Sequence, residues 1–131
     1  MVPLYERVGG EQFFETLVGR FYAGVASDPV LRPLYPEDLS ESKVHLTLFL
    51  IQYWGGPATY AEQRGHPRLR MRHAPFVIGE AQRDAWVRHM AAAVTAAGLP
   101  PEEEGELMAY FTVTARSLLN VGRVGTQIRF S

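Results

Sequence analysis

The sequence contains no cysteine. This absence excludes disulfide bonds, thiolate metal sites and cysteine nucleophiles in one step. The sequence also lacks a run of about 18 apolar residues, the length that a membrane-spanning helix needs. It lacks the positively charged start followed by a shorter apolar run that marks a signal peptide. Neither a membrane span nor a signal peptide is predicted, and we expect a soluble, cytoplasmic protein.

An excess of charge is also lacking. Thirteen basic side chains stand against 14 acidic ones, and Lys43 is the one lysine among the basic residues. Without a basic excess, a nucleic-acid partner is not expected. With 131 residues, of which 47% are hydrophobic, the chain is long enough for one domain with one core. We expect residues 1–131 to form that domain, with a loose tail at 121–131.

Apolar residues at helical spacing predict an all-α fold with no convincing strand. Glycine and proline separate four long helices, which are expected at residues 11–26, 40–54, 80–97 and 101–120. Ser40 is the expected N-cap of the second helix. The proline-rich segment 30–36 is expected to form a corner that presents Tyr35. Residues 57–66 are expected to be a loop, and a loop of this length in a compact domain usually has a function.

The segment that follows this loop has the most distinctive composition, because residues 65–76 read GHPRLRMRHAPF. Its two prolines limit it to a helix of about two turns. His73 lies in the last turn on the same face as Leu69, and arginines occupy the other faces. One imidazole beside an apolar residue, surrounded by guanidinium groups, suits a haem, whose iron takes a nitrogen ligand and whose propionates pair with cations. A capping or core histidine is the alternative.

Three aromatic residues with polar tips stand among apolar neighbours: Tyr22, Tyr35 and Trp86. A buried hydroxyl or indole N–H needs a partner, and a bound dioxygen with partial negative charge would supply one. On spacing alone, core aromatics with satisfied polar tips are the favoured interpretation of all three residues. In that case the chain would be a helical interaction module without a cofactor, which would lack the intense Soret absorption band of a haem protein.

Taken together, the motifs of this chain resemble those of the truncated haemoglobins, and within them the second, O-type group. The resemblance extends over roughly residues 4–120, and the motifs that carry it are Gly9-Gly10, Phe21-Tyr22, Tyr35-Pro36, the run Gln52 to Pro57, the run Arg64 to Phe76, and Asp84-Ala85-Trp86. It implies a globin-like fold, a truncated two-over-two helical sandwich around one haem b (iron protoporphyrin IX). It also implies that His73 is the proximal iron ligand and that Tyr22, Tyr35 and Trp86 donate hydrogen bonds to the distal ligand.

Further residues are expected around such a haem. Ser42 and Leu46 would face the distal side, and the small side chain of Ser42 would leave a route for ligands. Apolar contacts to the porphyrin are expected from Phe49, Leu69, Phe76, Ile78 and Met90. Propionate contacts are expected from Arg72, Arg64 and Tyr60, with a solvated cationic face as the alternative. His45 stands where many relatives carry arginine, which leaves its propionate role open. His89 is expected to be exposed, and neither His89 nor His66 is the expected iron ligand.

The function implied is the binding of dioxygen or another small diatomic ligand on ferrous iron, with slow release. Several donors around one ligand favour tight binding, since each hydrogen bond contributes roughly 1 kcal/mol. Slow release suits oxidative chemistry, such as nitric oxide dioxygenation or peroxidase-like turnover, or gas and redox sensing. Enzyme activity, a reductase partner and a homodimer are left open by the sequence, and no membrane partner is expected.

Overall fold

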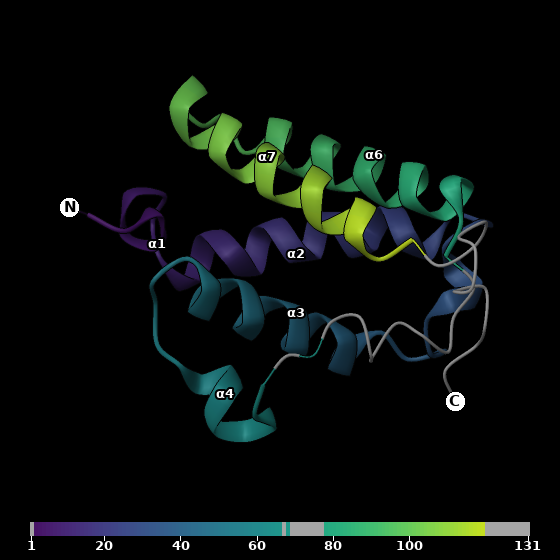
Figure 1. The fold of residues 1–131 in the computed structure, drawn as a ribbon, viewed down its shortest axis with the longest axis horizontal. Helices are drawn as coiled ribbons and strands as arrows, with labels where there is room; N and C mark the ends of the chain where they lie inside the picture. Colours follow the sequence, from purple (N-terminus) through teal and green to yellow (C-terminus); the bar gives the residue numbers. More distant parts are fainter. Residues whose placement is uncertain (1, 67, 69–77, 120–131) are drawn as a thin grey trace.

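The computed structural model describes residues 2–66, 68 and 78–119. Two antiparallel helix pairs form two layers, with α6 (Glu80–Ala96) and α7 (Pro101–Ser117) lying across α2 (Glu11–Ala26) and α3 (Ser40–Tyr53) (Figure 1). The described ranges contain helices and turns and no strand. The predicted all-α, two-over-two arrangement is therefore confirmed.

The first long helix, α2, has the bounds that its apolar spacing predicts. It buries one stripe of side chains completely or nearly so, namely Phe14, Leu17, Val18, Phe21, Tyr22 and Val25. Gly10 precedes the helix with a φ of 75°, a left-handed conformation that a residue with a Cβ adopts at a cost. The stripe packs against both α3 and α6, so that α2 lies at the centre of the sandwich.

The corner after α2 also follows the prediction. It contains a short 3-10 helix, η1 (Arg32–Leu34), and then turns toward α3. The guanidinium group of Arg32 donates to the carbonyl oxygens of Tyr35, Pro36 and Glu37 over 3.3, 2.9 and 2.6 Å. Three bonds from one side chain thus fix the backbone on which Tyr35 is presented.

The predicted N-cap of α3 is wrong. Ser40 is the first helical residue rather than the N-cap, and no side chain caps the helix from the residue before it. Instead, the Asp38 carboxylate accepts a hydrogen bond from the Ser40 N–H at 2.9 Å, two residues along the chain. Aspartate forms such short local bonds as readily as serine, and a negative charge at this end also suits the helix dipole.

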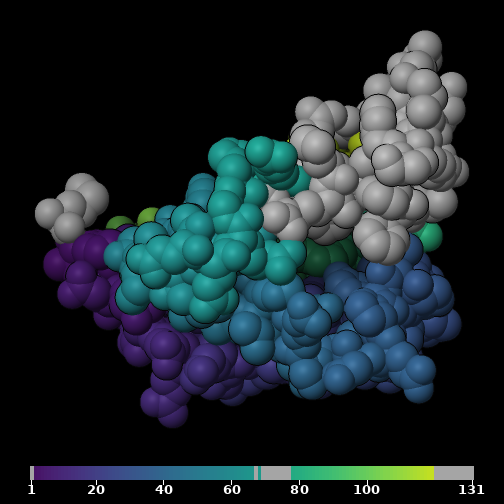
Figure 2. Space-filling view, turned by 90° about the horizontal axis from the view of Figure 1, so that it is seen from below, coloured from purple at the N-terminus to yellow at the C-terminus, as the bar shows by residue number. Residues whose placement is uncertain are grey.

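The expected loop at 57–66 contains a helix, α4 (Thr59–Arg64). Its N-terminus is joined to α3 by the Gln52 side chain, whose Oε1 accepts the Ala61 N–H at 2.8 Å. Tyr60 is 5% exposed and anchors the helix from the inside. These contacts to α3, against which α4 lies in Figure 2, explain a helix that local spacing does not predict. The predicted short helix around His73 and the tail at 121–131 lie outside the described residues.

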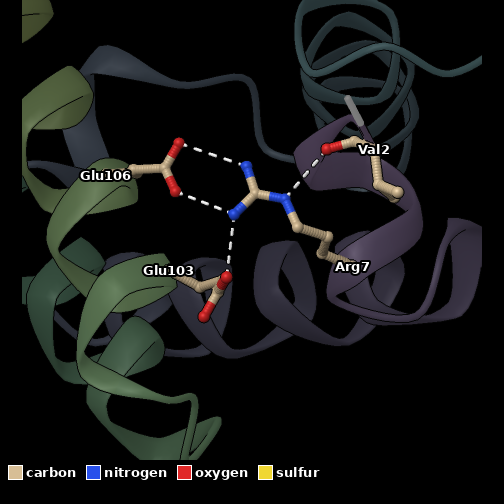
Figure 3. A network of polar contacts seen from close by, with 4 residues as sticks. All are labelled: Val2, Arg7, Glu103 and Glu106. Carbon is tan, nitrogen blue, oxygen red and sulfur yellow. Dashed lines mark hydrogen bonds and ion pairs between the residues drawn. The ribbon is translucent and has the colours of Figure 1, made fainter.

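Arg7, the last residue of α1 (Leu4–Arg7), joins α1 to the first turns of α7 at one end of the sandwich. Its guanidinium group donates to Glu103 at 2.8 Å and to both carboxylate oxygens of Glu106 at 3.0 and 3.3 Å, while its Nε donates to the Val2 carbonyl oxygen (Figure 3). These bonds lower the pKa of the Glu106 carboxyl below its ordinary value. We call Arg7 with its two glutamates the Arg7 clamp.

Within the described ranges, no helix combines the length and the apolar character that crossing a bilayer requires.

Candidate functional site

A cavity of about 500 Å³ lies between the helix layers, in the size range of roughly 300–1,000 Å³ that is usual for small-molecule sites. Side chains from α2, the corner, α3, α4, α6 and α7 line it. Ten of the residues that the sequence indicates as site residues are among them: Tyr22, Tyr35, Ser42, His45, Leu46, Phe49, Tyr60, Arg64, Ile78 and Trp86.

One part of the lining holds Tyr22, Tyr35 and Trp86, which we call the donor wall. The rings of Tyr22 and Tyr35 meet edge to face with centroids 5.5 Å apart, and Trp86 makes a hydrogen bond with the Tyr35 hydroxyl. Because an indole N–H can only donate, the Tyr35 oxygen is the acceptor. Three polar tips from three separate segments therefore meet in one place in a largely apolar cavity.

Trp86 is held firmly in the donor wall. Its ring contacts Phe21 of α2 with centroids 5.2 Å apart and Phe111 of α7 with centroids 5.8 Å apart, both edge to face. Phe21 and Phe111 are themselves buried in the core. Since both neighbours are fixed, the indole N–H is held in position by packing on two sides.

Burial keeps both tyrosines of the donor wall neutral. It raises the pKa of Tyr22 far above its usual value, and the nearby Tyr35 hydroxyl raises it further. Burial also raises the pKa of Tyr35 to about 12, against a hydrogen bond from Trp86 that lowers it. Each hydroxyl therefore retains its proton at neutral pH and is able to donate to a partly negative ligand.

Asp28 joins the end of α2 to α6. It lies just after α2, and its carboxylate accepts from the Val30 N–H at 2.8 Å, from His89 Nε2 at 2.6 Å and from Arg88 at 3.1 Å. The His89 side chain is 22% exposed, so the prediction that it is exposed is wrong. Gly24 leaves the space for this pairing, because a Cβ there would overlap the His89 ring.

We expect the Asp28→Asn variant to be less stable than wild type at neutral pH. The hydrogen bond from His89 and that from the Val30 N–H lower the pKa of the Asp28 carboxyl. A lowered folded-state pKa contributes stability that is present above the ordinary value of about 3.9 and is lost as the pH falls through the folded value. Thermal unfolding from pH 7 to pH 3 should thus show a gap between the two proteins that closes in acid.

The exposed Asp84 provides the control, because it pairs only with its chain neighbour Arg83 among the contacts observed. Asp84→Asn should follow the wild-type curve at every pH. A gap between Asp28→Asn and wild type that stays constant down to pH 3 would show that the Asp28 charge makes no contribution.

Arg64 and His45 form a polar edge at the same cavity. A guanidinium N–H of Arg64 lies 3.1 Å from His45 Nε2, and because arginine only donates, that ring nitrogen is the acceptor. The Arg64 guanidinium also lies over the Tyr60 ring at 5.9 Å. Its Nε is buried and has no acceptor among the described residues. A buried cationic N–H without a partner is costly, so a hydrogen-bond acceptor at this position would stabilise Arg64.

The remaining predicted residues divide into two sets. Met90 is fully buried and packs in the core cluster rather than in the cavity lining. His73, Arg72, Leu69 and Phe76 lie outside the described residues.

Sequence reasoning missed part of the lining. Phe111 and Leu118 line the cavity, together with Leu31, Leu34, Pro36, Leu50, Gln82, Arg83, Tyr110, Thr114 and Ala115, and none of these was among the expected site residues. A signal for the α7 members was present. Tyr110, Thr114 and Leu118 recur every four residues and so share one helix face.

Comparisons with known proteins agree on one family. The family model described as "Bacterial-like globin" matches residues 3–120. The group 2 truncated haemoglobin YjbI of Bacillus subtilis (strain 168) is 43% identical over 116 residues, which are 88% of this chain and 87% of that protein.

Solved structures give the same result. A thermostable haemoglobin from the actinobacterium Thermobifida fusca superposes with a TM-score of 0.91 at 54% identity, covering 93% of this chain and 100% of that one. A truncated oxygen-avid haemoglobin from Bacillus subtilis superposes with a TM-score of 0.86 at 42% identity, covering 91% and 100%. The chain therefore belongs to the bacterial-like globins and, within them, to the group 2 truncated haemoglobins, a family whose members bind haem b and small diatomic ligands on it.

Proposed function

We propose that this chain is a cytoplasmic protein that binds one haem b in the cavity and takes up dioxygen, or another small diatomic ligand, on ferrous iron. The observation that carries the proposal is the donor wall, in which Tyr22, Tyr35 and Trp86 bring three polar tips together in a largely apolar cavity. A relative in Bacillus subtilis is described as oxygen-avid, which is consistent with several donors around one ligand.

The residues of the cavity fit a haem. Its walls are largely aliphatic and aromatic, which suits a porphyrin face, and the buried Nε of Arg64 without an acceptor suits a propionate. His73 is the proposed proximal ligand and Arg72 a second propionate partner, both on the grounds of the sequence. When bound, the haem supplies the iron on which the diatomic ligand is held.

The side chains of the site hold the ligand by hydrogen bonds and exclude water from it. Tyr22 is 4% exposed, and neutral hydroxyl and indole groups surround the space beside it. Each added hydrogen bond to a ligand contributes roughly 1 kcal/mol, and more if the ligand is charged. We expect slow ligand release, which suits nitric oxide dioxygenation, peroxidase-like chemistry or sensing better than delivery of oxygen.

Absorption spectroscopy tests the proposal directly. The purified protein, titrated with haem, should develop a Soret band that saturates at one haem per chain, and the ferrous form should bind dioxygen and carbon monoxide. Stopped-flow mixing of the oxygenated form with nitric oxide and with peroxide would then distinguish nitric oxide dioxygenation from peroxidase-like chemistry. A titration without saturation, or without a Soret band, would favour a helical module that binds no cofactor.

We expect Arg64→Ala to lose haem faster and to release oxygen at the wild-type rate. Arg64 belongs to the polar edge of the cavity and not to the donor wall. Its removal should therefore change the rate of haem loss without changing the rate of oxygen release. A partly exposed ion pair contributes roughly 1 kcal/mol or less, which corresponds to at most about a fivefold faster loss. The measurement is haem transfer to an apo-globin acceptor.

Arg20→Ala is the matched control, because Arg20 is exposed on α2 and does not line the cavity. Equal rates of haem transfer for Arg64→Ala and Arg20→Ala would remove Arg64 from the site.

A further inference from the structure

Asp28 is the one charged residue that is buried in the part of the chain that the structure describes. It is 7% exposed, and its side chain is not part of the cavity lining. A buried ion pair is weak evidence for stability, because the cost of removing two charges from water offsets much of their attraction. Hydrogen bonds to a carboxylate are directional, so they fix the geometry of the elements that they join. The elements that Asp28 joins therefore indicate its role.

The two carboxylate oxygens of Asp28 hold different parts of the chain. Oδ1 accepts the Val30 N–H at 2.8 Å, within the corner after α2. Oδ2 accepts from two residues of α6, from His89 Nε2 at 2.6 Å and from an Arg88 guanidinium N–H at 3.1 Å. Asp28 thus holds the corner through one oxygen and α6 through the other.

The corner side of this junction leads to Tyr35. The carbonyl oxygen of Asp28 accepts the Arg32 N–H at 2.8 Å. The guanidinium group of Arg32 in turn donates to the Tyr35 carbonyl oxygen at 3.3 Å. Two consecutive polar contacts therefore connect Asp28 to the backbone that presents the Tyr35 hydroxyl.

The α6 side of the junction leads to Trp86. His89 follows Trp86 by three residues, so the two side chains are neighbours on one side of α6. Trp86 contacts Phe21 of α2 with ring centroids 5.2 Å apart, and His89 is held by Asp28 just beyond the end of α2. An apolar ring contact alone permits α6 to turn about its axis, whereas a second, directional contact near it does not. The hydrogen bond between Asp28 and His89 therefore fixes the direction in which Trp86 points.

We propose that Asp28 is a positioning residue that aligns the indole N–H of Trp86 with the Tyr35 hydroxyl and with a ligand bound beside it. The inference rests on the function proposed above, in which Trp86 donates to the diatomic ligand. Asp28 does not line the cavity, so it acts by holding α6 and the corner in one fixed relation. The hydrogen bond from Trp86 to Tyr35 crosses from α6 to the corner and depends on that relation.

Asp28→Asn tests this role, because it keeps an oxygen for the Val30 N–H and replaces the oxygen that holds α6 by an amide group, which cannot accept. We expect the haem-loaded variant to release oxygen about two to ten times faster than wild type at neutral pH, the effect of weakening one hydrogen bond. Asp84→Asn is the matched control. It also removes a carboxylate near Trp86, but Asp84 pairs only with its neighbour Arg83 among the contacts observed, so the wild-type rate is expected.

A second background shows whether Asp28 acts through Trp86. Trp86→Phe removes the indole donor, so adding Asp28→Asn to that variant should have almost no further effect on oxygen release. Residues that act independently give additive effects, whereas residues that act through one another do not. The same acceleration in both backgrounds, or no acceleration in the wild-type background, would overturn the proposal.

The indole N–H of Trp86 is also observable directly. The chain has two tryptophans, so the nitrogen–proton correlation spectrum of the diamagnetic carbon monoxide complex should contain two indole signals, one of which Trp86→Phe identifies. Asp28→Asn should shift that signal and leave the signal of Trp54 in place. It should also raise the C–O stretching frequency, because a donor aimed at the ligand lowers it. An unchanged Trp86 signal would contradict a positioning role.

His89 supplies two variants that change the same contact from the side of α6. They leave the Asp28 carboxylate in place, so they test the contact even if Asp28→Asn fails to load haem. His89→Leu cannot donate and should release oxygen as fast as Asp28→Asn, whereas His89→Gln keeps an N–H donor and should restore a rate near that of wild type. Absence of a Soret band in the wild type would defeat the proposed function and this inference with it. Normal haem loading with equal oxygen off-rates in His89→Leu and His89→Gln would defeat this inference alone.

Discussion

His73→Gly should lose high-affinity haem binding, and added imidazole should restore it. The sequence offers no other histidine on the expected haem-facing side of the segment 65–76, so removal of this side chain removes the nitrogen that holds the iron. Glycine leaves a space into which free imidazole fits, and the restored complex would have the spectrum of a histidine-ligated haem. Haem titration followed at the Soret band, with and without imidazole, measures both effects.

His66→Gly is the control for this experiment. His66 is exposed, and its Nδ1 accepts the Arg68 N–H at 3.1 Å, a local contact unrelated to the cavity. The variant should bind haem with a normal ferrous spectrum. If His73→Gly kept that spectrum and His66→Gly lost it, the iron ligand would be His66.

Trp86→Phe should release oxygen about 10 to 150 times faster than wild type. Loss of a hydrogen bond to a partly charged ligand costs about 1.5–3 kcal/mol, and such losses appear mainly in the dissociation rate. Phenylalanine keeps most of the packing against Phe21 and Phe111, so the variant isolates the indole N–H from the cavity shape. The oxygen off-rate of the ferrous form, measured by stopped-flow displacement with carbon monoxide, gives the result.

The two tyrosines of the donor wall complete the comparison. Tyr22→Phe should have a smaller effect, because a hydroxyl rotates more freely than a packed indole. Tyr35→Phe removes the group that accepts the hydrogen bond of Trp86, which frees the indole for the ligand, and we expect slower release. An off-rate in Trp86→Phe within about twofold of wild type, beside a large change in Tyr22→Phe, would transfer the main role to Tyr22.

Local spacing predicted the long helices well because each has an apolar stripe with clear limits. Gly10 precedes α2 and Ser27 follows it, so both of its ends agree with the prediction. The start and end of α6 and the start of α7 agree within a residue or so. In contrast, α4 is held by Gln52 and Tyr60, whose contacts depend on the packing of α3. A short helix held by tertiary contacts cannot be predicted from the local spacing of apolar residues.

The candidate site shows the same division. Tyr22, Tyr35 and Trp86 come from three segments, so spacing alone could not bring them together, and the resemblance to truncated haemoglobins was needed. The structure gathers them around one cavity, and their action on a ligand remains a prediction. Met90 and His89 are residues whose environment the sequence predicted wrongly. The helical face of each was assigned from the sequence, but the neighbours that bury them come from other helices.

The Arg7 clamp has a consequence for the lifetime of the folded molecule. Arg7 is 96 and 99 positions away from its two partners along the chain, whereas each antiparallel helix pair closes a much shorter loop. Contacts between distant positions close the largest loops and tend to form after the local pairs have packed. Interactions that are absent from the folding transition state slow unfolding and leave the folding rate nearly unchanged. The clamp should therefore lower the rate at which the sandwich opens at this end during unfolding. It should not belong to the folding nucleus.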